Sequence, residues 1–365
     1  DVTLVAPTNR RPFGFDWESF GRLDALEILD LAQDIFPIDP TRVYLTGHSM
    51  GGHGSWQLGT LFPGRFAVVG PSAGWISFAT YSGKVPFPTG PFGWASFSAD
   101  TIQHVANLEK KSVYIIHGTA DDNVPIEQGE TMFATLKPFV DDLYFHKEPG
   151  AGHWWDGDAA PGADCVDWPP LFELMSERFL DPYELDFFFI SPSPAVSPTH
   201  SYVTVKTAYT PAERVKLTSK HNGDTVTLTA ENAIHLELDG AVLQSKGITK
   251  VVVNGESFSV TGDPIVVGSP AGKTPEAYGP LVQVFYRPFC IAYGEESSAW
   301  QSYASYLVST WNLIGNGQAC ALPISAVTEE LRAERNIVYV GVDADQVPFP
   351  ADMPIDWSND SVTIA

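Results

Sequence analysis

The segment RVYLTGHSMGGHGSW at residues 42–56 restricts the choice of fold more than any other part of the chain. A short run rich in β-branched residues leads into Gly47, Ser49 and Gly51, and a helical pattern follows directly. A strand, Gly-x-Ser-x-Gly and a helix in this order are typical of the nucleophile elbow, a sharp turn that holds a serine above a sheet edge. We expect Gly47 and Gly51 to be required because a Cβ two residues before or after the serine would crowd the turn.

The surrounding pattern predicts the sheet that such a turn needs. Strand-like segments between residues 1 and 180 are Val2–Val5, Val43–Thr46, Phe66–Gly70, Ser112–His117 and Asp142–His146. Helical patterns alternate with them at Leu23–Phe36, 50–62, 126–139 and 169–180. This alternation predicts an α/β fold with a mostly parallel sheet and helices on both faces. Gly52 and Gly54 are expected to keep the helix after the turn close to that sheet.

Three further segments follow this first domain, which we place at residues 1–190. SPSPAVSPTH at 191–200 carries three prolines and no apolar periodicity, which predicts a stiff, extended linker. Short alternating strands separated by Asn-Gly and Asp-Gly turns predict a β-rich module at 201–270. A strand, a long helical pattern and a second strand predict a small α/β module at 271–365.

The charge balance excludes several classes of partner. Lys and Arg number 21 and Asp and Glu number 44, so the net charge is −23. This charge repels nucleic-acid phosphates and anionic membranes, and no apolar run approaches the ~20 residues that span a bilayer. We therefore expect no nucleic-acid or membrane partner. The scarcity of basic residues favours a secreted or periplasmic protein.

Three cysteines, Cys165, Cys290 and Cys320, are present and none belongs to a C-x-x-C pair. At least one thiol is therefore unpaired. A Cys290–Cys320 disulfide and three unbridged thiols are the two alternatives.

The serine of the elbow needs a histidine to take its proton and a carboxylate to orient that histidine. In this type of fold the acid and then the base follow the serine along the chain, on loops at strand ends. SVYIIHGTADDNVP supplies Asp121, and PGAGHWW supplies His153. We predict Ser49, Asp121 and His153 as a catalytic triad, with the N–H of Met50 as an oxyanion donor. Asp122 is the alternative acid.

Other residues near these motifs have two interpretations each. Trp75 and Trp154 either line a substrate pocket or pack. His48 is expected to face away from the hydroxyl of Ser49, where it either packs or supports a residue of the site. The acids of the loop after His153 are either solvated or bind a structural ion; they are Asp156, Asp158 and Asp164. The chain has no H-E-x-x-H motif, no Cys/His cluster and no dinucleotide-binding fingerprint, so we expect no cofactor.

TGHSMGG, IHGTADDNVPIEQ and GAGHWW resemble the three catalytic motifs of the prolyl-oligopeptidase family of α/β-hydrolases. The resemblance covers roughly residues 1–180. It implies an α/β-hydrolase domain with Asp121 as the triad acid and His153 as the base. It also implies an acyl-enzyme and a peptide or ester substrate, because the family contains esterase-like members.

Complete α/β-hydrolase domains have further strands before the one expected at the start of this chain. DVTLVAP already has the pattern of a buried strand and no initiator methionine precedes it. We therefore expect a preceding segment or a second chain to complete the sheet and to supply the second oxyanion donor. A peptidase is favoured, and a carboxylesterase or a non-catalytic scaffold that binds a partner through its C-terminal modules are the alternatives.

Overall fold

The computed structural model describes residues 2–8, 16–81, 89–159, 161–211, 213–269, 273–279, 281–348, 355–357 and 362–364. The chain forms two compact units, the first ending at Tyr278 and the second beginning at Gly279. Each unit has its own sheets and its own core.

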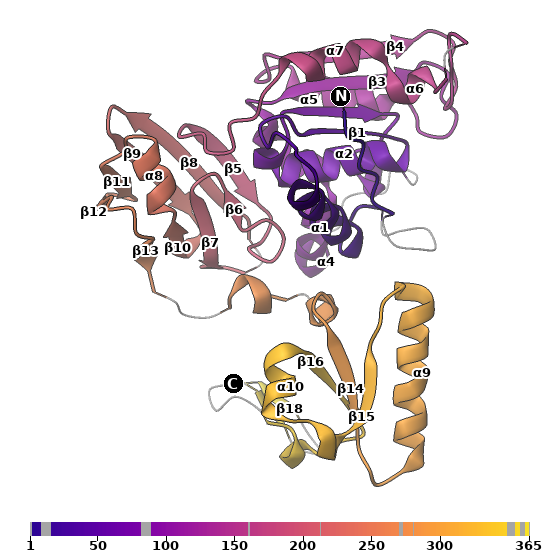
Figure 1. Cartoon of the computed structure of the whole chain (residues 1–365), viewed down its shortest axis with the longest axis vertical. Coiled ribbons are helices and arrows are strands. Elements are labelled where there is room, and N and C mark those ends of the chain that lie inside the picture. The colour runs from indigo at the N-terminus through magenta and orange to yellow at the C-terminus, as the bar shows by residue number, and fades with distance from the viewer. Residues whose placement is uncertain are drawn as a thin grey trace. The chain divides into compact units, whose positions relative to one another are not determined.

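Unit 1 begins with a four-stranded parallel sheet in the order β1-β2-β3-β4 (Figure 1). Its strands are β1 (Tyr44–His48), β2 (Val68–Ser72), β3 (Ser112–Gly118) and β4 (Leu143–Glu148). All three pairings are parallel. The α/β prediction is confirmed for this part of the chain, and each of these strands lies within two residues of its expected position.

Helices cover both faces of this sheet, because neighbouring strand residues point to opposite sides. Val69 packs in one cluster with residues of α1 (Phe20–Ile35), α2 (Met50–Leu61) and α5 (Glu127–Leu136). Val68 packs in another with residues of α7 (Pro169–Glu177). Shorter helices in this region are α3 (Phe78–Tyr81), α4 (Gly90–Ser96) and α6 (Asp164–Asp167). Short 3₁₀ helices are η1 (Pro63–Arg65), η2 (Phe97–Ala99), η3 (Thr101–Gln103) and η4 (Val105–Leu108).

The strand expected at Val2–Val5 is not formed. Residues 2–8 pair with no strand among the described residues, and the side chains of Val2 and Leu4 are exposed. An apolar run becomes a strand only where a neighbouring strand accepts its hydrogen bonds. The expectation that another segment or chain completes the sheet stays a prediction.

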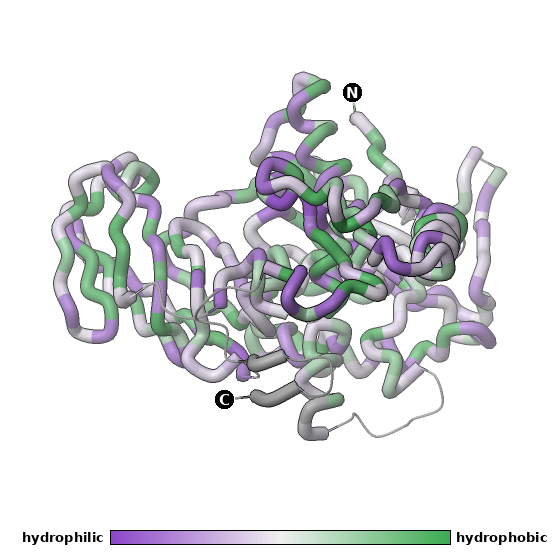
Figure 2. Tube along the Cα trace, turned by 90° about the horizontal axis from the view of Figure 1, so that it is seen from below, coloured by the Kyte–Doolittle hydropathy of each residue, from purple (hydrophilic) through white to green (hydrophobic). Residues whose placement is uncertain are grey.

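The β-rich part of unit 1 is two sheets around one core, in the orders β13-β10-β7-β6 and β12-β11-β9-β8-β5. The strands are β5 (Phe187–Ser191), β6 (Thr199–His200), β7 (Val203–Ala208), β8 (Val215–Asn222), β9 (Thr225–Glu231), β10 (Ala233–Leu238), β11 (Lys250–Val253), β12 (Glu256–Ser259) and β13 (Ile265–Gly268). A short helix, α8 (Gly240–Ser245), follows β10 and was not expected from the sequence. Apolar and polar segments alternate along these strands in Figure 2, and buried residues alternate with exposed ones in β9.

The domain boundaries differ from those expected. Phe187–Ile190 was assigned to the first domain, but β5 pairs with β8 of the β-rich part. The segment 191–200 is not an extended linker, because the carbonyl of Ser193 accepts from Val196 N–H and the segment ends in β6. Tyr278 is buried in the β-rich core, so this part extends past the expected end at residue 270.

Asn107 links the two parts of unit 1, the parallel sheet with its helices and the β-rich part. The two parts are in direct contact, and no free linker separates them. Its side-chain amide donates to the carbonyls of Thr60 and Ile190, at 2.8 and 2.9 Å, and its Oδ1 accepts from the N–H of Ile190 at 2.7 Å. The buried side chain therefore joins α2 to β5.

Unit 2 contains a parallel sheet in the order β15-β14-β16. Its elements are β14 (Phe289–Tyr293), α9 (Ser298–Gly315), β15 (Cys320–Pro323), α10 (Glu329–Glu334) and β16 (Asn336–Val340). The two expected strands and the helix are present, and β15 and α10 are additional. The remaining elements after Tyr278 are η6 (Leu281–Phe285), η7 (Ile324–Ala326), η8 (Ala344–Gln346), β17 (Ile355–Trp357) and β18 (Val362–Ile364). One further 3₁₀ helix, η5 (Pro275–Ala277), lies just before Tyr278.

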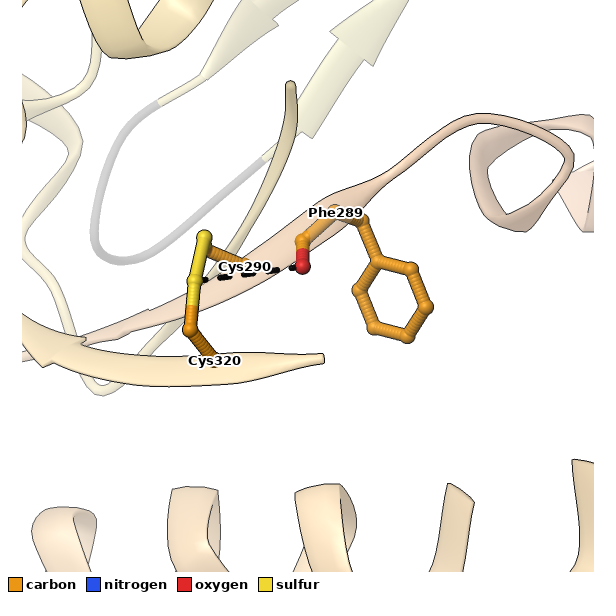
Figure 3. Close-up of a disulfide and its surroundings, with 3 residues drawn as sticks. All are labelled: Phe289, Cys290 and Cys320. Atoms are coloured by element: carbon orange, nitrogen blue, oxygen red, sulfur yellow. Dashed lines mark hydrogen bonds between the residues drawn. A yellow bond between two sulfur atoms is a disulfide. The ribbon is translucent and has the colours of Figure 1, made fainter. Parts of the chain in front are cut away.

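Cys290 and Cys320 form a disulfide between the neighbouring strands β14 and β15 (Figure 3). Their Cα atoms lie 4.5 Å apart, and Sγ of Cys320 lies 4.0 Å from the carbonyl oxygen of Phe289. Cys165 is a free, buried cysteine of unit 1. Of the two alternatives left by the sequence, the structure has the disulfide.

Alkylation under denaturing conditions tests this pairing. Without a reductant we expect one of the three cysteines to react, because only Cys165 carries a thiol. After reduction all three should react, and the Cys165→Ser variant should show none before reduction and two after it. Intact mass reports these numbers, and three alkylated residues in the unreduced wild type would contradict the disulfide.

Candidate active site

Ser49 occupies the turn between β1 and α2 in a conformation that side-chain-bearing residues rarely adopt. Its φ is 58° and its ψ is −113°. Backbone strain of this kind persists where the surrounding structure holds it, often at functional sites. The N–H of Ser49 donates to the carbonyl of Ser72, the last residue of β2, at 2.9 Å. This bond fastens the strained turn to the neighbouring strand.

Glycine is required at position 47, but the expected reason for glycine at 51 is wrong. A Cβ on Gly47 would lie 2.4 Å from the carbonyl oxygen of Gly51, whereas a Cβ on Gly51 would meet nothing within 4 Å. The backbone of Gly51 therefore excludes a side chain at position 47, whereas the backbone of Gly47 leaves room for a side chain at position 51.

Gly52 and Gly54 accommodate different neighbours. A Cβ on Gly52 would lie 2.3 Å from the carbonyl oxygen of Ser72, so this glycine does allow α2 to approach the end of β2. A Cβ on Gly54 would lie 2.4 Å from the indole of Trp17, in the segment before α1. The expectation that Gly54 faces the sheet is therefore wrong, and its neighbour is a side chain that the sequence pattern did not indicate.

The structure brings Ser49, His153 and Asp121 into one continuous contact. Nε2 of His153 lies 2.9 Å from Oγ of Ser49, and Nδ1 of His153 lies 2.8 Å from Oδ2 of Asp121. A carboxylate only accepts hydrogen bonds, so Nδ1 carries the proton and Nε2 is left to accept from the serine hydroxyl. The three residues follow β1, β4 and β3, whose parallel alignment brings their carboxyl ends to one edge of the sheet.

Asp121 is held rigidly and is shielded from solvent. Its side chain is 0% exposed, and its Oδ1 accepts from the N–H groups of Asn123 and Val124, both at 2.9 Å. His117 donates from Nε2 to the carbonyl of Val124 at 2.8 Å and lies beside Asp121, and burial lowers the pKa of its ring. The rival acid, Asp122, is exposed, and the contact to His153 comes from Asp121.

The loops that carry Asp121 and His153 are bound to each other. The N–H of Thr119 donates to the carbonyl of Glu148 at 2.9 Å, and the N–H of Ala120 donates to that of Ala151 at 2.8 Å. A Cβ on Gly118 would lie 2.4 Å from the carbonyl oxygen of Gly152. The close approach fixes the separation of the acid and the base.

His48 does more than pack beside the serine. Its Nδ1 lies 3.0 Å from Oγ of Ser72, and that hydroxyl donates to the carbonyl of Cys165. Since a hydroxyl has one proton to give, Nδ1 of His48 is the donor to Ser72. Burial, and secondarily the nearby His153, lower the pKa of His48 to about 4, so the ring is neutral near pH 7.

The two tryptophans proposed for the pocket have different surroundings. Trp75 is only 5% exposed and is stacked between the rings of His53 and Tyr81, so packing is the better interpretation for this residue. Trp154 is 65% exposed and its ring centroid lies 4.1 Å from that of His48.

Sequence reasoning gave no signal for the residues that support Trp75. His53 is fully buried on α2, with Nδ1 2.9 Å from the Trp75 carbonyl and Nε2 3.4 Å from Glu18. Glu18 belongs to a stretch in which Asp16, Trp17 and Ser19 all have positive φ. The helical pattern expected from Leu23 onward does not reveal this strained approach to α1.

No group of three or more His, Cys, Asp or Glu side chains within the described residues is arranged to hold a metal ion. In the loop after His153, Oδ2 of Asp164 accepts from the N–H of Gly157 at 2.9 Å. Within the same part of the chain, no helix is both long and apolar enough to cross a membrane.

Residues 16–163 match the model of the prolyl oligopeptidase family. Over these residues the chain is similar to that family. The matched segment contains Ser49, Asp121 and His153, together with β1 to β4.

Two relatives extend this result. Over 141 residues the chain is 33% identical to the uncharacterized peptidase YuxL of Bacillus subtilis, an alignment that covers 36% of this chain and 21% of YuxL. Over 190 residues it is 26% identical to an uncharacterized secreted protein of Arthroderma benhamiae, with 46% of this chain and 20% of that protein covered. The chain spans about a fifth of the length of these curated relatives.

Two solved structures are similar to part of the chain. A thermostable esterase matches with a TM-score of 0.32 and 19% identity, over 44% of this chain and 37% of the esterase chain. A putative dipeptidyl aminopeptidase IV from Bacteroides ovatus matches with a TM-score of 0.36 and 18% identity, over 44% and 22% of the two chains.

Paired alanine substitutions test the packing of the turn at Ser49. Gly52→Ala should lower the free energy of unfolding by about 1–3 kcal/mol, because the new Cβ meets the backbone of β2. Gly51→Ala is the control on the same helix, and should leave stability unchanged or raise it by up to ~1 kcal/mol, since alanine favours helix. Urea unfolding measures both, and equal losses in the two variants would contradict the packing.

The titration of His48 gives a second test. Its native pKa of about 4 lies below the value of 6.5 for a free histidine. Unfolding therefore takes up a proton between these two pH values, and the stability present above pH 6.5 is lost as the pH falls toward 4. Imidazole NMR of the wild type and of His48→Gln, which removes the resonance, should assign the low midpoint to this ring. A His48 midpoint near 6.5 would contradict its burial.

Proposed function

We propose that the chain carries a serine hydrolase domain that cleaves an amide or ester bond through an acyl-enzyme. The observation that carries the proposal is the continuous contact from Asp121 through His153 to Ser49, within the segment that matches the model of the prolyl oligopeptidase family. Within this proposal Ser49 is the nucleophile, His153 the general base and then acid, and Asp121 the group that orients and stabilises the imidazolium.

The proposed reaction has two steps. Oγ of Ser49 attacks the carbonyl carbon while its proton moves to Nε2 of His153. The bond to the leaving oxygen or nitrogen then breaks, and Nε2 returns the proton to that atom. In the second step water, deprotonated by the same imidazole, attacks the acyl carbon. The bond to Oγ of Ser49 then breaks, and Nε2 of His153 returns the proton to that oxygen. The N–H of Met50, the residue after the nucleophile, is the proposed donor to the negatively charged oxygen.

A peptide is the proposed substrate class. The match to the family model and the relative named as a peptidase support this choice. An ester of the same acyl group would pass through the same acyl-enzyme, so an ester and an amide that share one acyl group separate a peptidase from a carboxylesterase. A large preference for the ester, with no turnover of peptides, would favour the carboxylesterase.

We propose an extracytoplasmic location, either extracellular or periplasmic. The Cys290–Cys320 disulfide supports it, because such bonds persist in oxidising compartments. The relative named as a secreted protein supports it as well.

The two neighbouring acids provide a matched test of the catalytic roles. Asp121→Asn should lower kcat about 10⁴-fold, since loss of the carboxylate leaves the histidine without its orienting partner. Asp122→Asn changes the same group one residue away on an exposed side chain and should leave kcat close to that of the wild type. Ser49→Ala should lower it about 10⁶-fold.

Hydrolysis of matched esters and amides measures these rates, and thermal unfolding confirms that the variants fold. A loss in Asp122→Asn with Asp121→Asn unaffected would reassign the acid. A folded wild type with no more turnover than Ser49→Ala would overturn the proposed enzyme and favour the non-catalytic scaffold.

A further inference from the structure

Trp154 presents a large aromatic surface directly beside the histidine of the candidate triad. It follows His153 in the chain and is 65% exposed. The two rings meet edge to face, with centroids 6.0 Å apart and an interplanar angle of 85°. An exposed indole at this position is not needed for the core, because its neighbour Trp155 packs with the α7 cluster.

The indole of Trp154 packs against His48, a side chain that is itself held by a hydrogen bond. The ring of His48 lies 4.1 Å from that of Trp154 and 4.8 Å from that of His153. His48 is tied through Ser72 to the carbonyl of Cys165, so β1, β2 and the loop after His153 are joined at this point. Trp154 therefore packs on a side chain that is itself held in place.

The chemistry of acyl transfer decides which part of a substrate lies beside this surface. In the tetrahedral intermediate the leaving atom and Oγ of Ser49 are bonded to the same carbon. Nε2 of His153 takes the proton of Ser49 and must reach the leaving atom to deliver it. The leaving group therefore departs alongside the imidazole of His153. The exposed aromatic surface of Trp154 lies next to that imidazole.

We propose that Trp154 binds the leaving group and selects substrates whose leaving alcohol or amine carries a flat aromatic ring. The inference rests on the proposed function and specifies its substrate class. Aromatic pairs in stacked or edge-to-face contact gain about two- to tenfold over what the buried area alone provides. The acyl-enzyme no longer contains the leaving group, so Trp154 acts on acylation and not on the attack by water.

Two substrate pairs isolate this contribution. The first is a benzyl and a cyclohexylmethyl ester of one acyl group, and the second is one peptide with phenylalanine or cyclohexylalanine after the scissile bond. Within each pair the leaving groups have the same number of carbons and differ in flatness and aromaticity. The ratio of kcat/KM values within a pair reports the preference for the aromatic leaving group.

We expect the wild type to prefer the aromatic member and Trp154→Ala to reduce that preference about two- to tenfold. Trp154→Phe should restore most of it, which a merely structural role would not predict. The rate of acyl-enzyme hydrolysis should be equal in all variants, because the leaving group has gone. Phe179→Ala removes an aromatic side chain of similar exposure, 63%, and should leave the ratio unchanged.

The outcomes separate this inference from the function on which it rests. Turnover above the Ser49→Ala background with the same ratio in wild type and Trp154→Ala would overturn the role of Trp154 and leave the hydrolase intact. If Trp154→Ala changed the rates according to the acyl group of the substrate and not according to its leaving group, the role of Trp154 would be overturned as well. No turnover above background on either pair would overturn the proposed function and this inference together.

Discussion

The parallel alignment of β1 to β4 is the constraint on which the rest of the site depends. Because the strands run in one direction, the residues that follow β1, β3 and β4 emerge at the same edge of the sheet. Ser49, Asp121 and His153 are far apart in the sequence and meet only there. The contacts that support them, from the Ser72 carbonyl to the Val124 amide, are mostly backbone groups whose positions the strands set.

The site is built so that its histidine has few ways to move. The loop of His153 is bound to the loop of Asp121 through backbone hydrogen bonds and to β2 through Ser72 and Cys165. In the proposed mechanism the ring of His153 becomes positively charged, and His48, which stays neutral beside it, adds no repulsion. Such preorganisation is what acyl transfer requires, since a displaced base loses most of its effect.

Local patterns predicted the parts of this structure that depend on local physics. The β-branched runs gave β1 to β4, and the motifs around Ser49, Asp121 and His153 indicated residues that do lie in contact. The failures concern contacts between distant segments. The apolar side chains of Phe187–Ile190 would suit a strand of either sheet, so the pairing of this segment with β8 could not be recognised from the sequence. The sequence around Gly54 does not indicate that this residue faces Trp17. The sequence around His48 does not indicate that its partner Ser72 is hydrogen-bonded to the carbonyl of Cys165.

An activated serine at position 49 is the central claim, and covalent labelling tests it most directly. Fluorophosphonates react with a serine only when a neighbouring base takes its proton and the site stabilises the oxyanion. Peptide mapping of the labelled protein should find one adduct, on Ser49, which disappears when the protein is first unfolded in urea and in the Ser49→Ala variant. The absence of an adduct on the folded wild type, or a label that persists in Ser49→Ala, would contradict the account.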